Sequence, residues 1–233
     1  FGILAAYAEK SGADYIATGH YAQVRPYKGA PCLSKAIDAG KDQVYFLSQV
    51  DPRILSKCIF PVGGFHKAET RALAESLNLP VFDKKDSQGL CFMGMVDMAE
   101  FLSHAVPLVD GVVHNEQGEV IGTHTGAQQF TLGQRHGFTL TIASREPHYV
   151  VGVDVEKNTI TVSTQMEKGR ETLTLHSVVR FAELDTKKKY DVQVRYHGAL
   201  VAGTVASTGE TAVITLDTPH TVALGQVAVV YDG

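Results

Sequence analysis

The sequence predicts an α/β N-terminal part, followed by a small central domain and a C-terminal β-barrel. Residues 1–92 alternate between helical and strand patterns, which is typical of α/β layer structures. From residue 111 the pattern changes to short strands and turns, and from about residue 173 only short strands remain, punctuated by Gly or Pro. The 233 residues are sufficient for two or three domains.

The first predicted elements are a helix and a short buried strand. The helix has one apolar face, made of Ile3, Leu4, Tyr7 and Ala8. Gly12 can adopt the left-handed conformation that ends a helix. Residues 15–18 then form the strand, which runs into Gly19 and His20. Open α/β sheets bind ligands beyond the carboxyl ends of their strands, so both residues are candidates for ligand contacts.

The later elements follow from the same periodicities. A packing helix is predicted over residues 66–79, with Asn78–Pro80 as its stop signal, and a short capped helix over residues 97–105. The central domain begins with strands at residues 112–113 and 120–121 and contains a hairpin over residues 149–163. The barrel strands are expected at residues 192–196, 201–205, 211–216 and 227–231.

Composition excludes several classes of protein. No apolar run approaches the ~20 residues that span a bilayer, and the first residues lack the features of a signal peptide, so we expect a cytoplasmic protein without membrane contacts. The formal net charge of −4 argues against a protein that coats nucleic acid indiscriminately. The net charge does not exclude local basic patches, such as residues 187–189 with Arg195 and His197. A solvated strand end is the simpler interpretation of these residues.

The three cysteines are widely separated, which indicates neither a disulfide scaffold nor a zinc site. Cys91 follows a polar turn in the segment DSQGLCF and is the candidate for chemistry. A thiolate there can become a persulfide, whose terminal sulfur is nucleophilic. For a lone cysteine without further evidence, a buried, inert side chain is the favoured interpretation. We interpret Cys58, in an apolar stretch, and Cys32, beside Pro31 in a loop, as structural.

Two further segments combine polar side chains suited to RNA. Lys41 can meet a phosphate and Gln43 can pair with a base edge, although this segment alone is better explained as an exposed first turn of a helix. His20 could contact a phosphate or hydroxyl, or be a satisfied histidine. Residues 131–138 place Arg135 between glycines, which would suit RNA contacts or only shape a β-turn.

The order of seven segments resembles the family of tRNA-specific 2-thiouridylases over nearly the whole chain. The segments are GADYIATGHYA, KDQVYFLSQV, DSQGLCF, TLGQRHGF, HYVVGVD, VRY and GQVAVVYDG. The resemblance implies a partial Rossmann-like ATP-pyrophosphatase domain over residues 1–93, a central domain over 94–165 and a C-terminal β-barrel over 166–233. It also implies 2-thiolation of the wobble uridine of tRNA, in which ATP adenylates the C2 oxygen and a cysteine persulfide delivers the sulfur before AMP leaves.

The resemblance assigns roles by motif. Cys91 corresponds to the catalytic persulfide cysteine and Gly19 to an ATP contact. The residues that correspond to tRNA contacts are His20, Lys41, Asp42, Gln43, Arg195, Tyr196 and Gln226. ATP with Mg²⁺, a tRNA and a protein that donates persulfide sulfur are therefore the expected cofactor and partners.

The sequence also departs from the family pattern. The family's nucleotide loop, Ser-Gly-Gly-Val-Asp-Ser, and its first catalytic cysteine belong ahead of the position of Phe1, and His136 stands where lysine is common. We therefore expect the 233 residues alone not to turn over. A noncatalytic tRNA-binding remnant is the main alternative, and an ATP-pyrophosphatase acting on a small molecule is a third. Methylation is disfavoured because no glycine-rich methyl-donor loop follows a strand.

Overall fold

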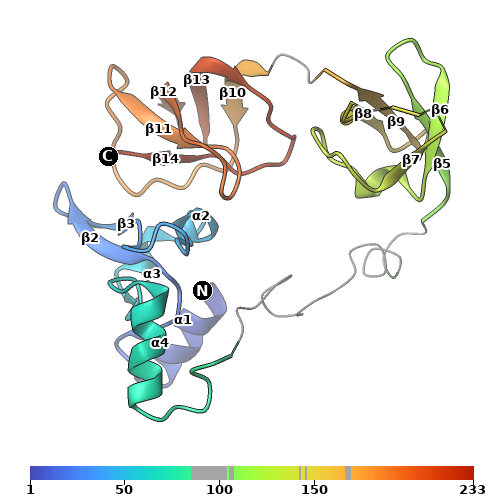
Figure 1. The fold of residues 1–233 in the computed structure, drawn as a ribbon. Coiled ribbons are helices and arrows are strands. Elements are labelled where there is room, and N and C mark those ends of the chain that lie inside the picture. The colour runs from blue at the N-terminus through green and yellow to red at the C-terminus, as the bar shows by residue number, and fades with distance from the viewer. Residues whose placement is uncertain (85–103, 105–107, 142, 145, 166–168) are drawn as a thin grey trace. The chain divides into compact units, whose positions relative to one another are not determined.

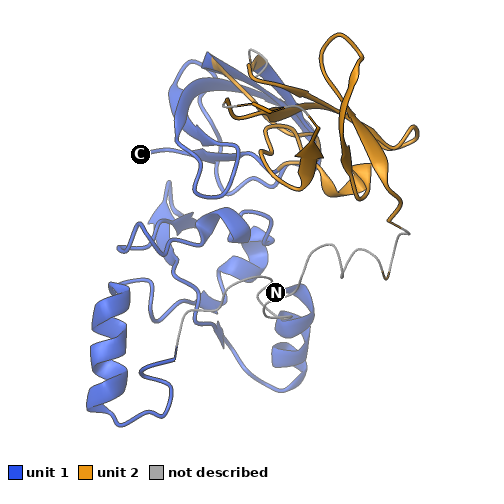
Figure 2. Ribbon diagram, turned by 45° about the vertical axis from the view of Figure 1, so that its right-hand side comes forward, with its two compact units in different colours: residues 1–85, 172–218, 227–233 blue, residues 86–171, 219–226 orange. Residues whose placement is uncertain are grey.

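The computed structural model describes residues 1–84, 104, 108–141, 143–144, 146–165 and 169–233 (Figure 1). The chain divides into two compact units (Figure 2). The first comprises Phe1–Lys85, Thr172–Thr218 and Val227–Gly233, and the second Asp86–Glu171 and Pro219–Gln226. In the part of the chain that is described, no helix has the length and apolarity required to cross a bilayer.

The N-terminal part of the first unit has the mixed α/β content that the sequence predicts. Its elements are α1 (Gly2–Lys10), β1 (Ile16–Ala17), β2 (Gln23–Tyr27), β3 (Ala30–Ser34), α2 (Val44–Leu47), α3 (Pro52–Leu55), β4 (Cys58–Ile59) and α4 (Lys67–Ser76). β1 pairs with β4 in parallel, and β2 pairs with β3 antiparallel. The shared core contains Ile16, Ala22, Val44, Leu47, Leu55, Cys58 and Phe60.

Helix α1 forms as predicted, but only small, partly buried side chains attach it to the core. Gly12 follows its end with a φ of 77°, the left-handed conformation expected there. Ile3 is 91% exposed and Tyr7 69%, whereas Ala5 and Ala8 pack against the core. Of the predicted apolar face of Ile3, Leu4, Tyr7 and Ala8, only Ala8 packs against this core, together with Ala5.

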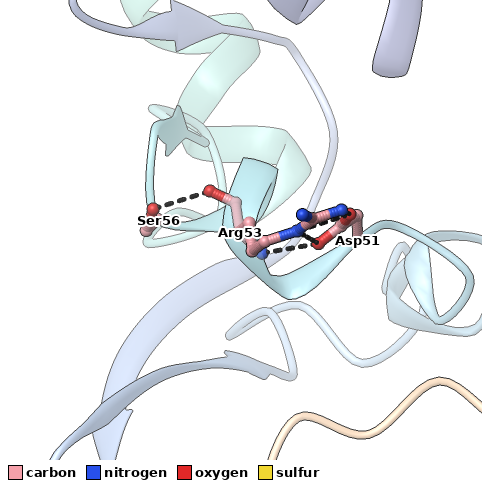
Figure 3. A network of polar contacts seen from close by, with 3 residues as sticks. All are labelled: Asp51, Arg53 and Ser56. Atoms are coloured by element: carbon pink, nitrogen blue, oxygen red, sulfur yellow. Dashed lines mark hydrogen bonds and ion pairs between the residues drawn. The ribbon is translucent and has the colours of Figure 1, made fainter.

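The short helix α3 begins at a well-formed N-cap. The Asp51 carboxylate accepts a hydrogen bond of 2.8 Å from the Arg53 backbone N–H and further bonds from the Arg53 guanidinium, and the Ser56 hydroxyl donates to the Arg53 carbonyl (Figure 3). An N-cap carboxylate satisfies a backbone donor that lacks a partner within the helix. The cap thus directs Leu55, which is 0% exposed, into the core.

Helix α4 lies within the predicted range but is not a simple packing helix. The Glu69 carboxylate accepts a hydrogen bond of 2.7 Å from the His66 backbone N–H at its start, and Asn78 follows its end with a φ of 52°. Leu73 is 50% exposed and Leu77 61%, although the sequence places both on its apolar side. Leu73 and Leu77 therefore contribute little to the core described here.

The second unit contains a five-stranded sheet with the order β7-β6-β5-β9-β8. Its elements are β5 (Gly111–His114), β6 (Val120–His124), the 3-10 helix η1 (Ala127–Gln129), β7 (Phe138–Leu140), β8 (Tyr149–Asp154) and β9 (Thr159–Ser163). The predicted hairpin is β8–β9, whereas β5 pairs with β9 in parallel. Val113, Val150, Ile160 and Val162 are among the most buried residues of its core.

A second five-stranded sheet has the order β10-β13-β12-β11-β14. Its strands are β10 (Arg170–Leu175), β11 (Lys189–Gln193), β12 (Val201–Thr208), β13 (Thr211–His220) and β14 (Val229–Tyr231). Ala212, Ile214 and Leu216 alternate inward along β13, as the period of two predicts. One detail differs: β11 ends at Gln193, so Tyr196 belongs to a loop rather than to the predicted strand.

Candidate functional site

The carboxyl end of β1 presents an open glycine beside a half-buried histidine. A Cβ atom added at Gly19 would meet nothing within 4 Å, so this position can accommodate a ligand. Nδ1 of His20 lies 2.9 Å from the Thr18 hydroxyl, and its ring is 5.6 Å from that of Phe1. Burial, followed by the charge of the chain's amino terminus, lowers the pKa of His20. A neutral imidazole at pH 7 favours a hydroxyl or base contact over an ion pair with phosphate.

The segment Lys41–Asp42–Gln43 is braced by hydrogen bonds to the backbone. The Gln43 amide oxygen accepts from the Tyr21 N–H at 2.9 Å, and the Gln43 N–H donates to the Tyr21 carbonyl at 2.9 Å. The Asp42 carboxylate accepts from the N–H groups of Ala36, at 2.6 Å, and Val44. Burial raises the pKa of Asp42, and these bonds oppose that rise. Asp42 and Gln43 therefore fix the shape of this loop.

The following helix α2 carries two aromatic side chains with different exposure. Tyr45 is 6% exposed, and its hydroxyl donates a hydrogen bond of 2.8 Å to the Val227 carbonyl. Phe46 is 59% exposed. The ring centroids of Phe46 and Tyr196 are 4.3 Å apart, and those of Tyr45 and Tyr196 are 6.1 Å apart. The first unit thus brings residues 41–46 next to the loop that contains Arg195 and Tyr196.

The sheet β10-β13-β12-β11-β14 is called the barrel sheet below. Hydrogen bonds from this sheet hold the loop that contains Arg195 and Tyr196. The Tyr231 hydroxyl donates to the Gln193 amide oxygen at 2.8 Å, and the Gln193 Nε2 donates to the Gly198 carbonyl at 3.3 Å. The Gly198 N–H donates to the Arg195 carbonyl at 2.8 Å. Burial, and then the negative charge of Asp42, raises the pKa of Tyr196, while Lys41 opposes the rise. Lys41, Asp42 and Tyr196 are therefore electrostatic neighbours.

Two candidate residues do not belong to the described part of the first unit. Gln226 is exposed in the loop between β13 and β14 and belongs to the second compact unit. Its N–H donates to the Ala223 carbonyl at 3.3 Å. Cys91 lies outside the residues that the structure describes, as does most of the helix predicted over residues 97–105.

The other two cysteines have poor environments for thiolate chemistry. Cys58 is 7% exposed, its Sγ lies 3.3 Å from the Ile54 carbonyl oxygen, and burial raises its thiol pKa. Burial also raises the pKa of the Cys32 thiol, which is half-buried in β3 rather than in the loop that the sequence suggested. Both environments disfavour the nucleophilic thiolate form.

Two polar segments have structural explanations. In the GQR segment the Gln134 amide bridges its own turn, accepting from the Thr131 N–H and donating to the His136 carbonyl. In the basic run, Lys188 is paired with Asp232 and Lys189 with Asp217. These contacts favour the simpler interpretation of both segments, a shaped turn and a solvated strand end.

Phe46 was not among the predicted site residues. Its signal was present, because the adjacent aromatics Tyr45 and Phe46 follow the polar trio directly. Within the described ranges, no three His, Cys, Asp or Glu side chains gather in a way that could hold a metal ion.

Three family domains match the chain in sequence order. They are a tRNA methyl transferase HUP domain over residues 1–95, a tRNA methyl transferase PRC-barrel domain over residues 99–164 and an aminomethyltransferase β-barrel domain over residues 170–233. The match to three successive domains accounts for the change from α/β to all-β structure along the chain.

Similar curated proteins carry one name. The tRNA-specific 2-thiouridylase MnmA of Dichelobacter nodosus is 37% identical over 100% of this chain and 64% of its own length. The proteins of that name from Pediococcus pentosaceus and Enterococcus faecalis are 38% and 40% identical, each over 97% of this chain and 64% of the relative. The chain thus spans about 64% of the length of these relatives. With this identity and these three domains, the chain belongs to the family of tRNA-specific 2-thiouridylases.

Proposed function

We propose that this chain supplies the tRNA-binding and sulfur-carrying parts of an ATP-dependent tRNA 2-thiouridylase. In this reaction ATP adenylates the C2 oxygen of the wobble uridine and pyrophosphate leaves. The terminal sulfur of a Cys91 persulfide then attacks C2, and AMP leaves. A second cysteine thiol attacks the Cys91 sulfur, which breaks the S–S bond, leaves the outer sulfur on C2 and forms a disulfide that a thiol reductant reopens. A protein persulfide donor recharges Cys91. The names of the relatives support this reaction. Because this chain spans 64% of their length, the reaction of the whole protein is proposed for it.

One observation carries the proposal most directly. Residues 41–43 and 195–196 are separated by about 150 positions, yet the ring contacts of α2 bring them to one surface. A lysine, an exposed arginine and aromatic rings on one surface match the chemistry of RNA, which offers phosphates and the faces of unpaired bases. In this proposal Lys41 and Arg195 bind phosphates, while Asp42 and Gln43 position the loop.

The end of β1 fits an adenine nucleotide. Gly19 leaves open space at the carboxyl end of a parallel strand, where α/β folds bind nucleotides. ATP, with Mg²⁺ on its phosphates, would supply the activating group for the uridine oxygen. In this chain, Gly19 would permit the close approach of the ligand, and the neutral His20 would contact the tRNA.

The sulfur-carrying role of Cys91 is tested by persulfide trapping. Incubating the 233-residue chain with a cysteine desulfurase and cysteine, followed by alkylation and mass spectrometry, should give a persulfide at Cys91. Cys91→Ser should abolish it. Cys32→Ser and Cys58→Ser, which remove thiols of raised pKa, should leave it unchanged.

The alternative proposal, a noncatalytic tRNA-binding remnant, predicts a different pair of results. Such a protein would bind tRNA with a salt-dependent affinity but carry no persulfide at Cys91. A persulfide that forms at Cys32 or Cys58 instead of Cys91 would refute the assigned cysteine.

A further inference from the structure

The aromatic rings of α2 and of the barrel loop form a continuous aromatic cluster, made of Tyr45, Phe46, Tyr196 and His197. The Tyr196 and His197 rings are stacked, with centroids 4.0 Å apart and an interplanar angle of 23°. Phe46 lies 4.3 Å from Tyr196 with its ring tilted by 45°. Tyr45 lies beneath them and is anchored through its hydroxyl to the Val227 carbonyl. Tyr196 is therefore the centre of the cluster, with Phe46 and His197 as its outer members.

The outer members are accessible. Phe46 is 59% exposed, and His197 is also exposed. An exposed phenylalanine face gains free energy when a flat apolar partner covers it. Tyr45, the third ring that pairs with Tyr196, is 6% exposed.

The backbone of the loop holds His197 in an unusual conformation. Its φ is 55°, in the left-handed region that costs free energy for a residue with a Cβ atom. The hydrogen bond from the Gln193 side chain to the Gly198 carbonyl, and that from the Gly198 N–H to the Arg195 carbonyl, fix the turn that imposes it. Strain of this kind persists where surrounding contacts hold it, and it is frequent at ligand-binding sites.

The charges around the cluster complement a nucleic acid. Arg195 precedes Tyr196 and is exposed, and its guanidinium forms no ion pair with any residue in the described ranges. Lys41 is close enough to influence the titration of Tyr196. Aromatic faces flanked by cations are typical of surfaces that bind single-stranded nucleic acid, because the rings stack on bases and the cations bind phosphates.

We propose that Phe46 and His197, with Tyr196 between them, form a stacking platform for an unpaired base of the tRNA. This inference rests on the proposed tRNA-binding function and extends it to two residues to which the resemblance assigned no role. Stacking requires only the π-face of a base, so the platform fits a nucleotide of a single-stranded loop and not one within a duplex.

The test uses the 233-residue chain and a tRNA with 2-aminopurine at unpaired anticodon-loop positions. Stacking on the platform should quench the 2-aminopurine fluorescence on binding. Phe46→Leu keeps the apolar volume but removes the π-face, and His197→Gly removes the ring while suiting a positive φ. Each should abolish the quench and weaken tRNA binding by about tenfold, the size expected for one lost base–aromatic contact. Phe46→Trp, which keeps an aromatic face, should retain both the quench and the affinity for tRNA.

Tyr7→Leu is the matched control, because Tyr7 is a 69% exposed aromatic residue of the same unit outside the cluster. It should change neither the quench nor the affinity. If Phe46→Leu and His197→Gly bind and quench like the unchanged chain, the platform is refuted while the proposed function stands. If the unchanged chain binds no tRNA, the proposed function and the platform both fail. Circular dichroism of each variant separates loss of stacking from loss of folding.

Discussion

At the scale of single residues, His124 is a buried titratable group among the described residues of the second unit. It is 3% exposed, and its Nδ1 accepts a hydrogen bond of 3.0 Å from the Gly126 N–H. Nδ1 must therefore be unprotonated, and the proton resides on Nε2, which has no hydrogen-bond partner within the described residues. Adding a second proton would break the bond to Gly126 and charge a buried ring.

This environment predicts that the second unit loses stability in mild acid. Burial lowers the pKa of His124, while the backbone of Asn158 and Val112 and the charge of Asp110 oppose the shift. The folded-state pKa of His124 is below the unfolded value of about 6.5. The contribution of neutral His124 to the free energy of unfolding is therefore fully present above about pH 6.5 and is lost as the pH falls toward the folded-state pKa. Hydrogen exchange at the Val113 and Ile160 amides should accelerate accordingly between pH 7 and pH 5, after correction for intrinsic exchange.

The control for this prediction replaces the ring by an amide. His124→Asn keeps an acceptor for the Gly126 N–H but cannot titrate, so it should flatten the pH dependence. His136→Asn, at an exposed position of the same unit, should leave it unchanged. Protection of these amides that stays constant down to pH 5 in the unchanged chain would contradict the assignment.

At the scale of elements, the loop between β4 and α4 packs closely against the backbone of the segment that follows His20. A Cβ atom added at Gly63 would lie 1.7 Å from the Ala22 carbonyl oxygen, and Ala22 is 0% exposed. The Gly63 carbonyl also accepts a hydrogen bond of 3.1 Å from the Ile37 N–H. The backbone contact at Gly63 thus positions residues 20–22 and, through Tyr21, the loop that contains Gln43.

Neighbouring glycines allow a matched test of this contact. Gly63→Ala should destabilise the chain by about 1–3 kcal/mol, because the methyl group overlaps backbone atoms that cannot move aside easily. Gly64→Ala should change the free energy of unfolding by less than about 0.5 kcal/mol, because its added Cβ would meet nothing within 4 Å. The midpoints of urea unfolding compare the two variants, and equal midpoints would mean that Gly63 imposes no such constraint.

Local sequence signals predicted the elements better than their pairing. The β8–β9 hairpin was predictable because alternating apolar residues flank a short polar turn, and the end of α1 because Gly12 favours a left-handed conformation. The parallel pairing of Val113 with Ile160 was not, since it joins positions 47 residues apart. Tyr196 was assigned to a strand because Val192 and Val194 continue the alternation, but the turn at Gly198 interrupts it.

At the scale of the whole molecule, contacts distant in sequence join the N-terminal part of the first unit to its barrel sheet. The Tyr27 hydroxyl and Lys188 both bind the Asp232 carboxylate, and the Lys28 ammonium donates to the Glu183 carbonyl at 2.9 Å. The Lys35 ammonium lies 4.2 Å from the centre of the Tyr231 ring. The candidate surface depends on such contacts, which explains why the sequence named its residues by motif but could not place Phe46 against Tyr196.

Asp232 is the residue through which this connection is best tested. The hydrogen bond from Lys188, and then that from Tyr27, lowers the pKa of Asp232 below its usual 3.8. Its stabilising contribution is therefore present above pH 3.8 and lost as the pH falls through the lower folded-state value. At pH 7, Asp232→Asn keeps an acceptor for the Tyr27 hydroxyl but removes the charge that pairs with Lys188, so the β2–β3 hairpin should exchange its amide hydrogens faster than in the unchanged chain.

Asp232→Asn should affect RNA binding only indirectly, by changing how α2 packs against the barrel loop, because Asp232 is outside the aromatic cluster. If the hairpin contacts help hold α2 against the barrel loop, Asp232→Asn should reduce the quench of 2-aminopurine in bound tRNA, and 0.5 M salt should reduce the difference between variant and unchanged chain by screening the Lys188 pair. Asp191→Asn, at an exposed position of β11, is the control and should affect neither exchange nor quench. Unchanged hairpin exchange in Asp232→Asn would mean that Tyr231, Tyr45 and the apolar packing hold the two parts together without this carboxylate.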